Sequence, residues 1–364
     1  MELYNRTPFA AEFTTAADRD GRSHLLLVAK STWRLPLGGE PAQWMAEQQA
    51  LVLADTATGE PGFSAPVEDC DFVLQKPRCE VLVLGSAYAP RGAAVAQVET
   101  GFKVGPLSKL MRVVGPRTWR GGMAVAPGAA TPFVRQPLSY DIAFGGTNVA
   151  ADGEIDACMN NPVGLGYSRR GPWDGMPMAQ TEAIDQPVMR PDHAYMPLGF
   201  GTLGRHWATR ARYAGTYDAH WQANLFPLLP PDFDPRFFQS APEDQQLDVL
   251  QGGMPVTLLN LTHPALTPSG RLDFVLPDVS LDVVFYRSQG EPVMLAGRAD
   301  TLVLQPDKQC FTVTWRASLP LRRDIREFEA IELRAPVPPA PSAPATGHQS
   351  NASQATTPHA MRNA

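Results

Sequence analysis

The residues of this chain that could do chemistry lie mainly in one stretch, residues 212–246. Asp232 and Asp234 stand two positions apart, a spacing that places two carboxylates on one side of an extended segment, where they can chelate a hard cation. Glu243 could act with either aspartate as an acid and base pair, the arrangement used in glycoside hydrolysis. The sequence therefore leaves open a carbohydrate-active or metal-dependent enzyme.

Other features of the sequence argue against catalysis. Pro231 and Pro235 bracket the two aspartates, and aspartates beside prolines commonly form turns, so a turn or cap role is favoured. His206 and His220 lack an H-x-x-x-H or H-E-x-x-H arrangement. The glycines of residues 199–204 have dinucleotide-binding spacing, but a proline-containing segment precedes them and the chain lacks βαβ periodicity. We therefore predict no catalytic residue, metal ligand or cofactor.

Arginine and aromatic side chains are concentrated in the same stretch. Arg–carboxylate pairs and tyrosine hydroxyls can fix a loop that has no strand partner, and arginines and aromatics are enriched at the centres of protein interfaces. We predict that eight residues lock residues 212–246 and present part of a partner-binding surface. They are Arg212, Tyr213, Tyr217, Asp218, Trp221, Asp232, Asp234 and Arg236.

The elements that must position these side chains are mostly strands. Proline makes up 36 of 364 residues, which favours short strands and long irregular connections. Apolar runs and alternating patterns predict strands within residues 24–37, 79–90, 93–119 and 254–321. We expect a mainly β protein, with antiparallel β-sandwich or barrel-like lobes and a few short helices. Residues 1–334 are predicted to form a single large domain or two lobes, of about 1–150 and 151–334.

Two helices are predicted inside the irregular stretch. Asp218 can cap a helix in AHWQANLF, where Trp221 and Leu225 share one face. We expect Trp221 to anchor a packed helix face, so that Trp221→Ala costs about 3–5 kcal/mol. Ser240 and Glu243 fit a capping box that opens a second helix extending to about Leu250.

Charge and composition limit the partners. Lys and Arg number 31 against 37 Asp and Glu, a net charge of −6, and without a basic patch neither nucleic acid nor membrane is an expected partner. The N-terminus lacks the apolar segment of a secretory leader, and four scattered cysteines are typical of reduced thiols, so we expect a cytoplasmic location.

Residues 335–364 are almost all small, polar or proline residues. Such a segment buries too little apolar surface to offset its chain entropy, so we predict a disordered tail. We expect removal of residues 335–364 to leave the melting temperature unchanged in a thermal unfolding experiment. A decrease of several degrees would show instead that the tail docks on the folded part.

Seven segments, in order along the chain, resemble the landmarks of one bacterial family, domain of unknown function 2169. They are KSTWRL (30–35), KPRCEVLVLGSAYAP (76–90), DIAFGGTN (141–148), NPVGLGY (161–167), ARYAGTYDAHW (211–221), FPLLPPDFDPRFFQSAPEDQQ (226–246) and LQGGMPVTLLNL (250–261). Seven such segments in family order are far more specific than one.

The resemblance implies a cytoplasmic adaptor or chaperone of type VI secretion. Members of the family look like proteins that help to load an effector, often one with a PAAR-like or Rhs region, onto the VgrG spike. The resemblance brings no catalytic residues. The effector, the position of the binding surface and the oligomeric state stay open.

Overall fold

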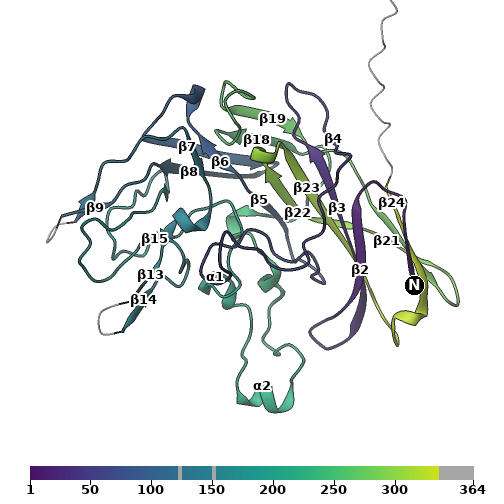
Figure 1. Cartoon of the computed structure of the whole chain (residues 1–364). Coiled ribbons are helices and arrows are strands. Elements are labelled where there is room, and N and C mark those ends of the chain that lie inside the picture. Colours follow the sequence, from purple (N-terminus) through teal and green to yellow (C-terminus); the bar gives the residue numbers. More distant parts are fainter. Residues whose placement is uncertain (122–124, 150–152, 336–364) are drawn as a thin grey trace, which may run out of the picture.

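The structure is a computed structural model that describes residues 1–121, 125–149 and 153–335 (Figure 1). Strands account for 38% of it and helices for 9%, which confirms the prediction of a mainly β protein. Within the described ranges the α-helices are α1 (Ala208–Ala211) and α2 (Ala219–Asn224). No sheet in these ranges closes into a barrel, and parallel strand pairs occur beside the antiparallel ones that were predicted.

The largest sheet has the strand order β17-β5-β22-β23-β3-β2, and β4 also pairs with β3. Its strands are β2 (Ala10–Ala17), β3 (Ser23–Arg34), β4 (Gln43–Trp44), β5 (Cys79–Val83), β17 (Gln246–Leu247), β22 (Arg298–Gln305) and β23 (Cys310–Pro320). Residues 25–33 of β3 are buried without alternation, as expected for a strand that is covered on both faces.

Two further sheets pack with the largest one. The first has the order β16-β8-β7-β18-β19, and the second has the order β1-β24-β20-β21. Their strands are β7 (Gln97–Val104), β8 (Leu107–Val114), β16 (Thr181–Glu182), β18 (Pro255–Leu259), β19 (Arg271–Val275), β1 (Glu2–Asn5), β20 (Asp282–Arg287), β21 (Val293–Ala296) and β24 (Phe328–Arg334). All four predicted strand regions therefore contain strands.

The remaining strands are short and form two-stranded sheets, mostly in the irregular middle of the chain. They are β6 (Ser86–Tyr88), β9 (Trp119–Arg120), β10 (Ala126–Pro127), β11 (Arg135–Pro137), β12 (Phe144–Gly145), β13 (Thr147–Val149), β14 (Ile155–Ala157) and β15 (Leu165–Gly166).

One large hydrophobic core joins the three main sheets. At its centre the ring of Phe9 stacks on Trp315 with centroids 5.6 Å apart, and Trp33 stacks on Phe311 at 6.5 Å. In each main sheet, strands from before residue 150 are neighbours of strands from after residue 151. The two halves of the chain thus share sheets and core, while the predicted domain boundaries stay predictions.

One of the two predicted helices is correct. Asp218 caps α2, accepting a hydrogen bond from Trp221 N at 2.8 Å. The helix predicted from Ser240 to about Leu250 is wrong: a 3₁₀ turn occupies Glu243–Gln245 and the chain then enters β17. The hydroxyl and N–H of Ser240 both donate to Glu80 instead of capping a helix, and β17 pairs with β5.

The predicted tail falls almost wholly on residues 336–364, which lie outside the described ranges, so its disorder stays a prediction. Among the residues that the structure describes, no helix combines the length and the hydropathy needed to span a membrane. All four cysteines are free thiols.

Candidate functional site

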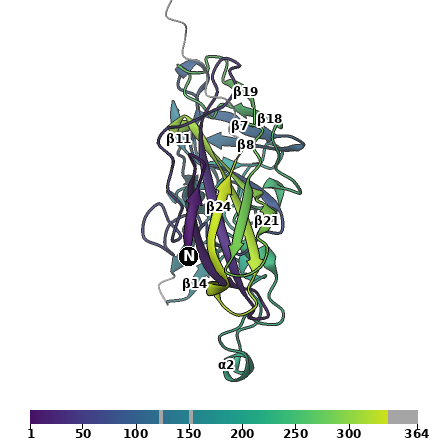
Figure 2. The ribbon, with the colours of Figure 1, turned by 90° about the vertical axis from the view of Figure 1, so that its right-hand side faces the viewer.

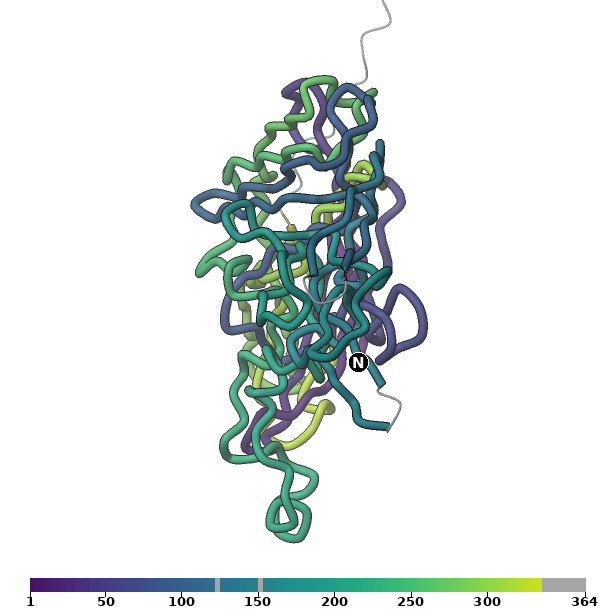
Figure 3. The backbone as a smooth tube through the Cα atoms, turned by 90° about the vertical axis from the view of Figure 1, so that its left-hand side faces the viewer, coloured from purple at the N-terminus to yellow at the C-terminus, as the bar shows by residue number. Residues whose placement is uncertain are grey.

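A projection of the chain carries most of the predicted site residues. We call residues 213–234 the finger: α2 lies at its far end, beyond the rest of the protein (Figures 1 and 2), and the opposite view shows the same projection (Figure 3). At its base, Asp234 N donates to Tyr213 O at 3.0 Å, which joins the two ends. A Cβ added to Gly21 would come within 2.5 Å of Leu228, so the finger also contacts the β2–β3 turn.

The outer part of the finger is held by its own side chains. The Trp221 ring contacts Tyr217 and Phe226, with centroids 4.7 and 5.6 Å apart, and its Nε1 donates to Leu228 O at 2.8 Å. Asp232 accepts hydrogen bonds from the N–H and the hydroxyl of Thr216, at 3.0 and 2.7 Å. These bonds join the outgoing and returning chains of the finger.

The end of the finger exposes apolar side chains next to polar ones of α2 such as His220 and Gln222. Tyr217 is 51% exposed, Phe226 68% and Leu228 40%. Exposed aromatic groups of this kind are typical anchors of protein interfaces. We call Tyr217, Trp221, Phe226 and Leu228 the aromatic tip.

The prediction of a packed helix face at Trp221 is wrong, because no residue of α2 is buried. Trp221 packs within the finger rather than against the core. We now expect Trp221→Ala to lower the free energy of global unfolding by less than about 1 kcal/mol, since changes outside the core have small effects. Limited proteolysis should nevertheless cut the variant faster within residues 214–233, and a decrease in global stability of several kcal/mol would contradict this assignment.

A second group of predicted residues lies at the base of the finger. The guanidinium groups of Arg212 and Arg236 lie 4.7 and 4.3 Å from the centre of the Tyr213 ring. Glu243 accepts hydrogen bonds from Arg212 at 2.8 Å and from the Tyr213 hydroxyl at 2.9 Å. Arg236 is bound to Asp234 through Nε at 2.9 Å. The structure thus divides the predicted residues between the base and the outer part of the finger.

A groove of about 670 Å³ opens beside this base. One wall is α1, another is the 236–246 segment, and Met196, Pro197 and Leu198 supply apolar surface. The buried Lys109 donates to Asp244 at 2.9 Å within it. Burial lowers the pKa of Lys109, against the opposing effect of the Asp244 carboxylate.

The carboxylates of the finger act as hydrogen-bond acceptors. The N–H and hydroxyl of Thr216 lower the pKa of Asp232, and Arg236 lowers the pKa of Asp234. A catalytic acid requires a carboxyl group whose pKa is raised, the opposite of both shifts. Within the described ranges, no group of three His, Cys, Asp or Glu side chains is placed to hold a metal ion. As favoured from the sequence, Asp232 lies in a turn, which the bond from Phe233 N to Pro230 O closes, and Asp234 caps the 3₁₀ turn Pro235–Phe238.

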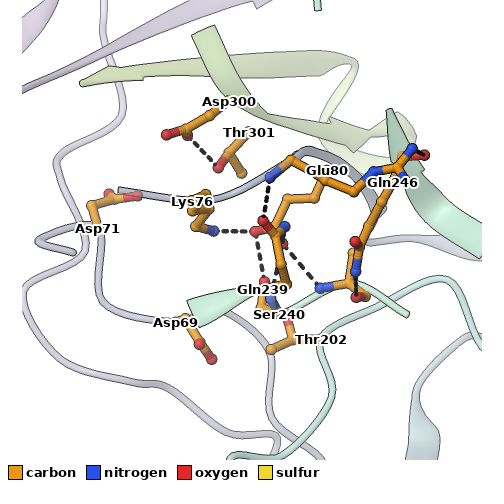
Figure 4. Close-up of polar contacts among 12 residues, drawn as sticks. Asp69, Asp71, Lys76, Glu80, Thr202, Gln239, Ser240, Gln246, Asp300 and Thr301 are labelled. Atoms are coloured by element: carbon orange, nitrogen blue, oxygen red, sulfur yellow. Dashed lines mark hydrogen bonds and ion pairs between the residues drawn. The ribbon is translucent and has the colours of Figure 1, made fainter. Parts of the chain in front are cut away.

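Sequence reasoning missed the buried cluster behind the groove. Glu80 of β5 is fully buried, forms an ion pair with Lys76 and accepts hydrogen bonds from Ser240 N and Oγ, both at 2.8 Å (Figure 4). Gln239 and Ala241 donate to the same carboxylate, at 3.0 and 3.1 Å. The four-residue Lys–Glu spacing was visible, but it normally indicates a helix pair, whereas here Glu80 lies in a strand.

The electrostatics of Glu80 favour its charged form. Burial alone would raise the pKa of this carboxyl group, but the Lys76 ammonium and the bonds from Ala241 and Ser240 outweigh that effect and lower it. Gln239, Ser240 and Ala241 belong to the 236–246 segment, which forms one wall of the groove. Their hydrogen bonds to Glu80 therefore hold this wall in place.

Residues 20–316 match the sequence model of domain of unknown function 2169, described as an uncharacterized protein conserved in bacteria. The chain belongs to this family. The match to the domain of unknown function 2169 family confirms the resemblance carried by the seven segments. It includes strands of all three main sheets, whereas β1, β2 and β24 lie outside residues 20–316. Neither the curated proteins nor the solved structures include a match to the chain.

Proposed function

We propose that this protein is a non-enzymatic adaptor or chaperone that binds a type VI secretion effector through its finger. The effector would carry a PAAR-like or Rhs region, and binding would precede loading onto the VgrG spike, in the cytoplasm. The secretion role rests on the family resemblance. The observation that supports a binding role is the aromatic tip, an exposed apolar surface held in place by hydrogen bonds within the finger.

A pre-ordered tip suits protein binding for an energetic reason. Ordering a flexible loop costs conformational entropy, and a surface that is ordered beforehand loses less on association. Trp221 is fixed by the Leu228 carbonyl and Thr216 by Asp232, so Tyr217 and Phe226 can meet a partner without reordering the finger. The partner would present an apolar pocket for these two rings.

The proposal is tested by co-purification. The tagged protein would be expressed with a PAAR-like or Rhs effector encoded beside its gene, and the recovered effector compared between wild type and a variant in which a short Gly-Ser linker replaces residues 215–232. We expect the wild type to recover the effector and the variant to lose it while keeping its melting temperature. Equal recovery by both proteins would refute binding through the finger.

The enzyme alternative is tested separately with Asp232→Asn/Asp234→Asn. We expect neither divalent cations nor sugar nucleotides to raise the melting temperature of the wild type, because both carboxylates already bind Thr216 or Arg236. A thermal shift that appears in the wild type and disappears in the double variant would favour the carbohydrate-active or metal-dependent enzyme over the adaptor.

A further inference from the structure

Strand β2 is an edge of the largest sheet, with β3 on one side only. The register pairs Ala17 with Ser23, and beyond it Asp18 N donates to Arg22 O at 3.0 Å. In an antiparallel ladder, hydrogen-bonded pairs alternate with non-hydrogen-bonded pairs. Because the even-numbered Asp18 is hydrogen-bonded, the even-numbered residues of β2 also bond to β3. The N–H and C=O groups of the odd-numbered residues therefore point away from β3, along the free edge.

These outward main-chain groups are almost unused. Among the residues that the structure describes, the one hydrogen bond to them comes from the Thr14 hydroxyl, which reaches Thr15 O at 3.5 Å. Glu12 and Thr15 are exposed, so solvent reaches this strand. An edge of eight residues with unpaired main-chain groups is a template for another strand.

The edge lacks the usual protection against pairing. Edge strands are generally shielded by charged side chains, prolines or bulges. The edge strand β19 of the five-stranded sheet, for example, carries Arg271 and Asp273. In β2 the sequence is AAEFTTAA, with Glu12 as its one charge, and the register with β3 is uninterrupted. Its small side chains leave the edge accessible to a second main chain.

We infer that β2 pairs with β2 of a second copy of this chain, antiparallel and about a two-fold axis at Thr14. In this register Thr14 faces Thr14 of the second copy, Phe13 faces Thr15 and Ala11 faces Ala17. The odd-numbered residues then exchange N–H···O bonds across the interface, and the two largest sheets become one continuous sheet.

The same register suits the side chains. Each Glu12 faces Ala16 of the second copy, and the two Glu12 residues lie four positions apart along the ladder, about 14 Å, so their repulsion is weak. The central pair is Thr14 with Thr14, a favourable cross-strand combination. Because the sequence of β2 is nearly symmetrical about its centre, two copies of the strand can pair without burying a charge. This interface uses none of the finger residues and is independent of the adaptor proposal.

Disulfide trapping tests the register. At a non-hydrogen-bonded pair the Cα atoms lie about 4.5 Å apart, within the range of a disulfide. Oxidised Thr14→Cys should therefore give a covalent dimer, whereas Ala16→Cys, on the same strand, should not, because the Ala16 residues of the two copies lie apart. The wild type, with its four free cysteines, provides the background. Equal trapping of the two variants, or no trapping of Thr14→Cys above that background, would overturn the proposed pairing.

Sedimentation tests the main-chain bonds. We expect the full-length wild type to sediment at twice the monomer mass and to dissociate on dilution. Thr15→Pro removes an outward N–H, a change that an edge strand tolerates, so it should be monomeric with a cooperative melting transition. Thr15→Lys places a charge at the same position and should also be monomeric. A wild type that stays monomeric at high micromolar concentration, or a Thr15→Lys dimer as stable as that of the wild type, would refute the inference.

Discussion

Glu80→Ala should lower the free energy of unfolding by about 3–5 kcal/mol, because it leaves Lys76 buried without its partner. The Ser240 and Ala241 N–H groups lose their acceptor as well. Urea denaturation of wild type and variant measures the difference. The matched control is Glu243→Ala, which removes an exposed carboxylate from Arg212 and should cost less than about 1 kcal/mol.

If Glu80→Ala proves too unstable to purify, Glu80→Gln removes the charge and retains most of the shape. Its loss of stability should be smaller than that of Glu80→Ala and larger than that of the Glu243 control. Wild-type stability in Glu80→Gln would show that the ion pair with Lys76 is dispensable, and the assignment of the Glu80 charge as a source of stability would then be wrong.

The same carboxylate should make stability depend on pH. The pKa of Glu80 is lowered in the folded protein, so its contribution is present above the ordinary value of 4.5 and is lost as the pH falls through the folded value. Glu80→Gln should therefore lose less stability than the wild type as the pH falls below 4.5. Parallel stability curves for the two proteins would contradict the lowered pKa.

Tyr217→Ala combined with Phe226→Ala should weaken effector binding by on the order of 100-fold or more. Truncating an aromatic anchor typically costs about 2 kcal/mol, and each 1.4 kcal/mol corresponds to about tenfold in affinity. Both side chains are exposed, so the melting temperature should not change. Titration calorimetry with the purified effector measures the effect.

The control for this variant is Met294→Ala. Met294 is 68% exposed on β21, as exposed as Phe226, but it lies in the four-stranded sheet and not in the finger. Its loss should leave the affinity unchanged. An equal loss of affinity in the control and in the double variant would indicate that general surface hydrophobicity, rather than the aromatic tip, determines binding.

The strands could be predicted because their pattern is local. The buried run in residues 25–33 and the alternation in β7 and β8 follow directly from which faces are covered. The order of the strands within the sheets could not be predicted. For example, β5 and β22 pair in parallel although some 220 residues separate Glu80 from Thr301. Pairing over such separations depends on the packing of the whole chain, which no local pattern specifies.

For the site too, contacts between residues close in the sequence could be predicted and contacts between distant residues could not. Asp218 was recognised as a cap because its bond to Trp221 spans three residues. The cluster of Arg212 and Tyr213 with Glu243 depends on the return of the chain after the finger, and Ser240 was misread because its true partner, Glu80, lies 160 residues away. Local chemistry was therefore readable from the sequence, and contacts between distant segments were not.

The most direct test of the central claim is site-specific photo-crosslinking in cells. A photoreactive phenylalanine would replace Phe226 at the aromatic tip and, in a control, Met294 on β21. The adaptor account predicts a crosslink to the PAAR-like or Rhs effector from position 226 and none from position 294. If the effector co-purifies with the protein but crosslinks only from position 294, the finger is not the binding surface.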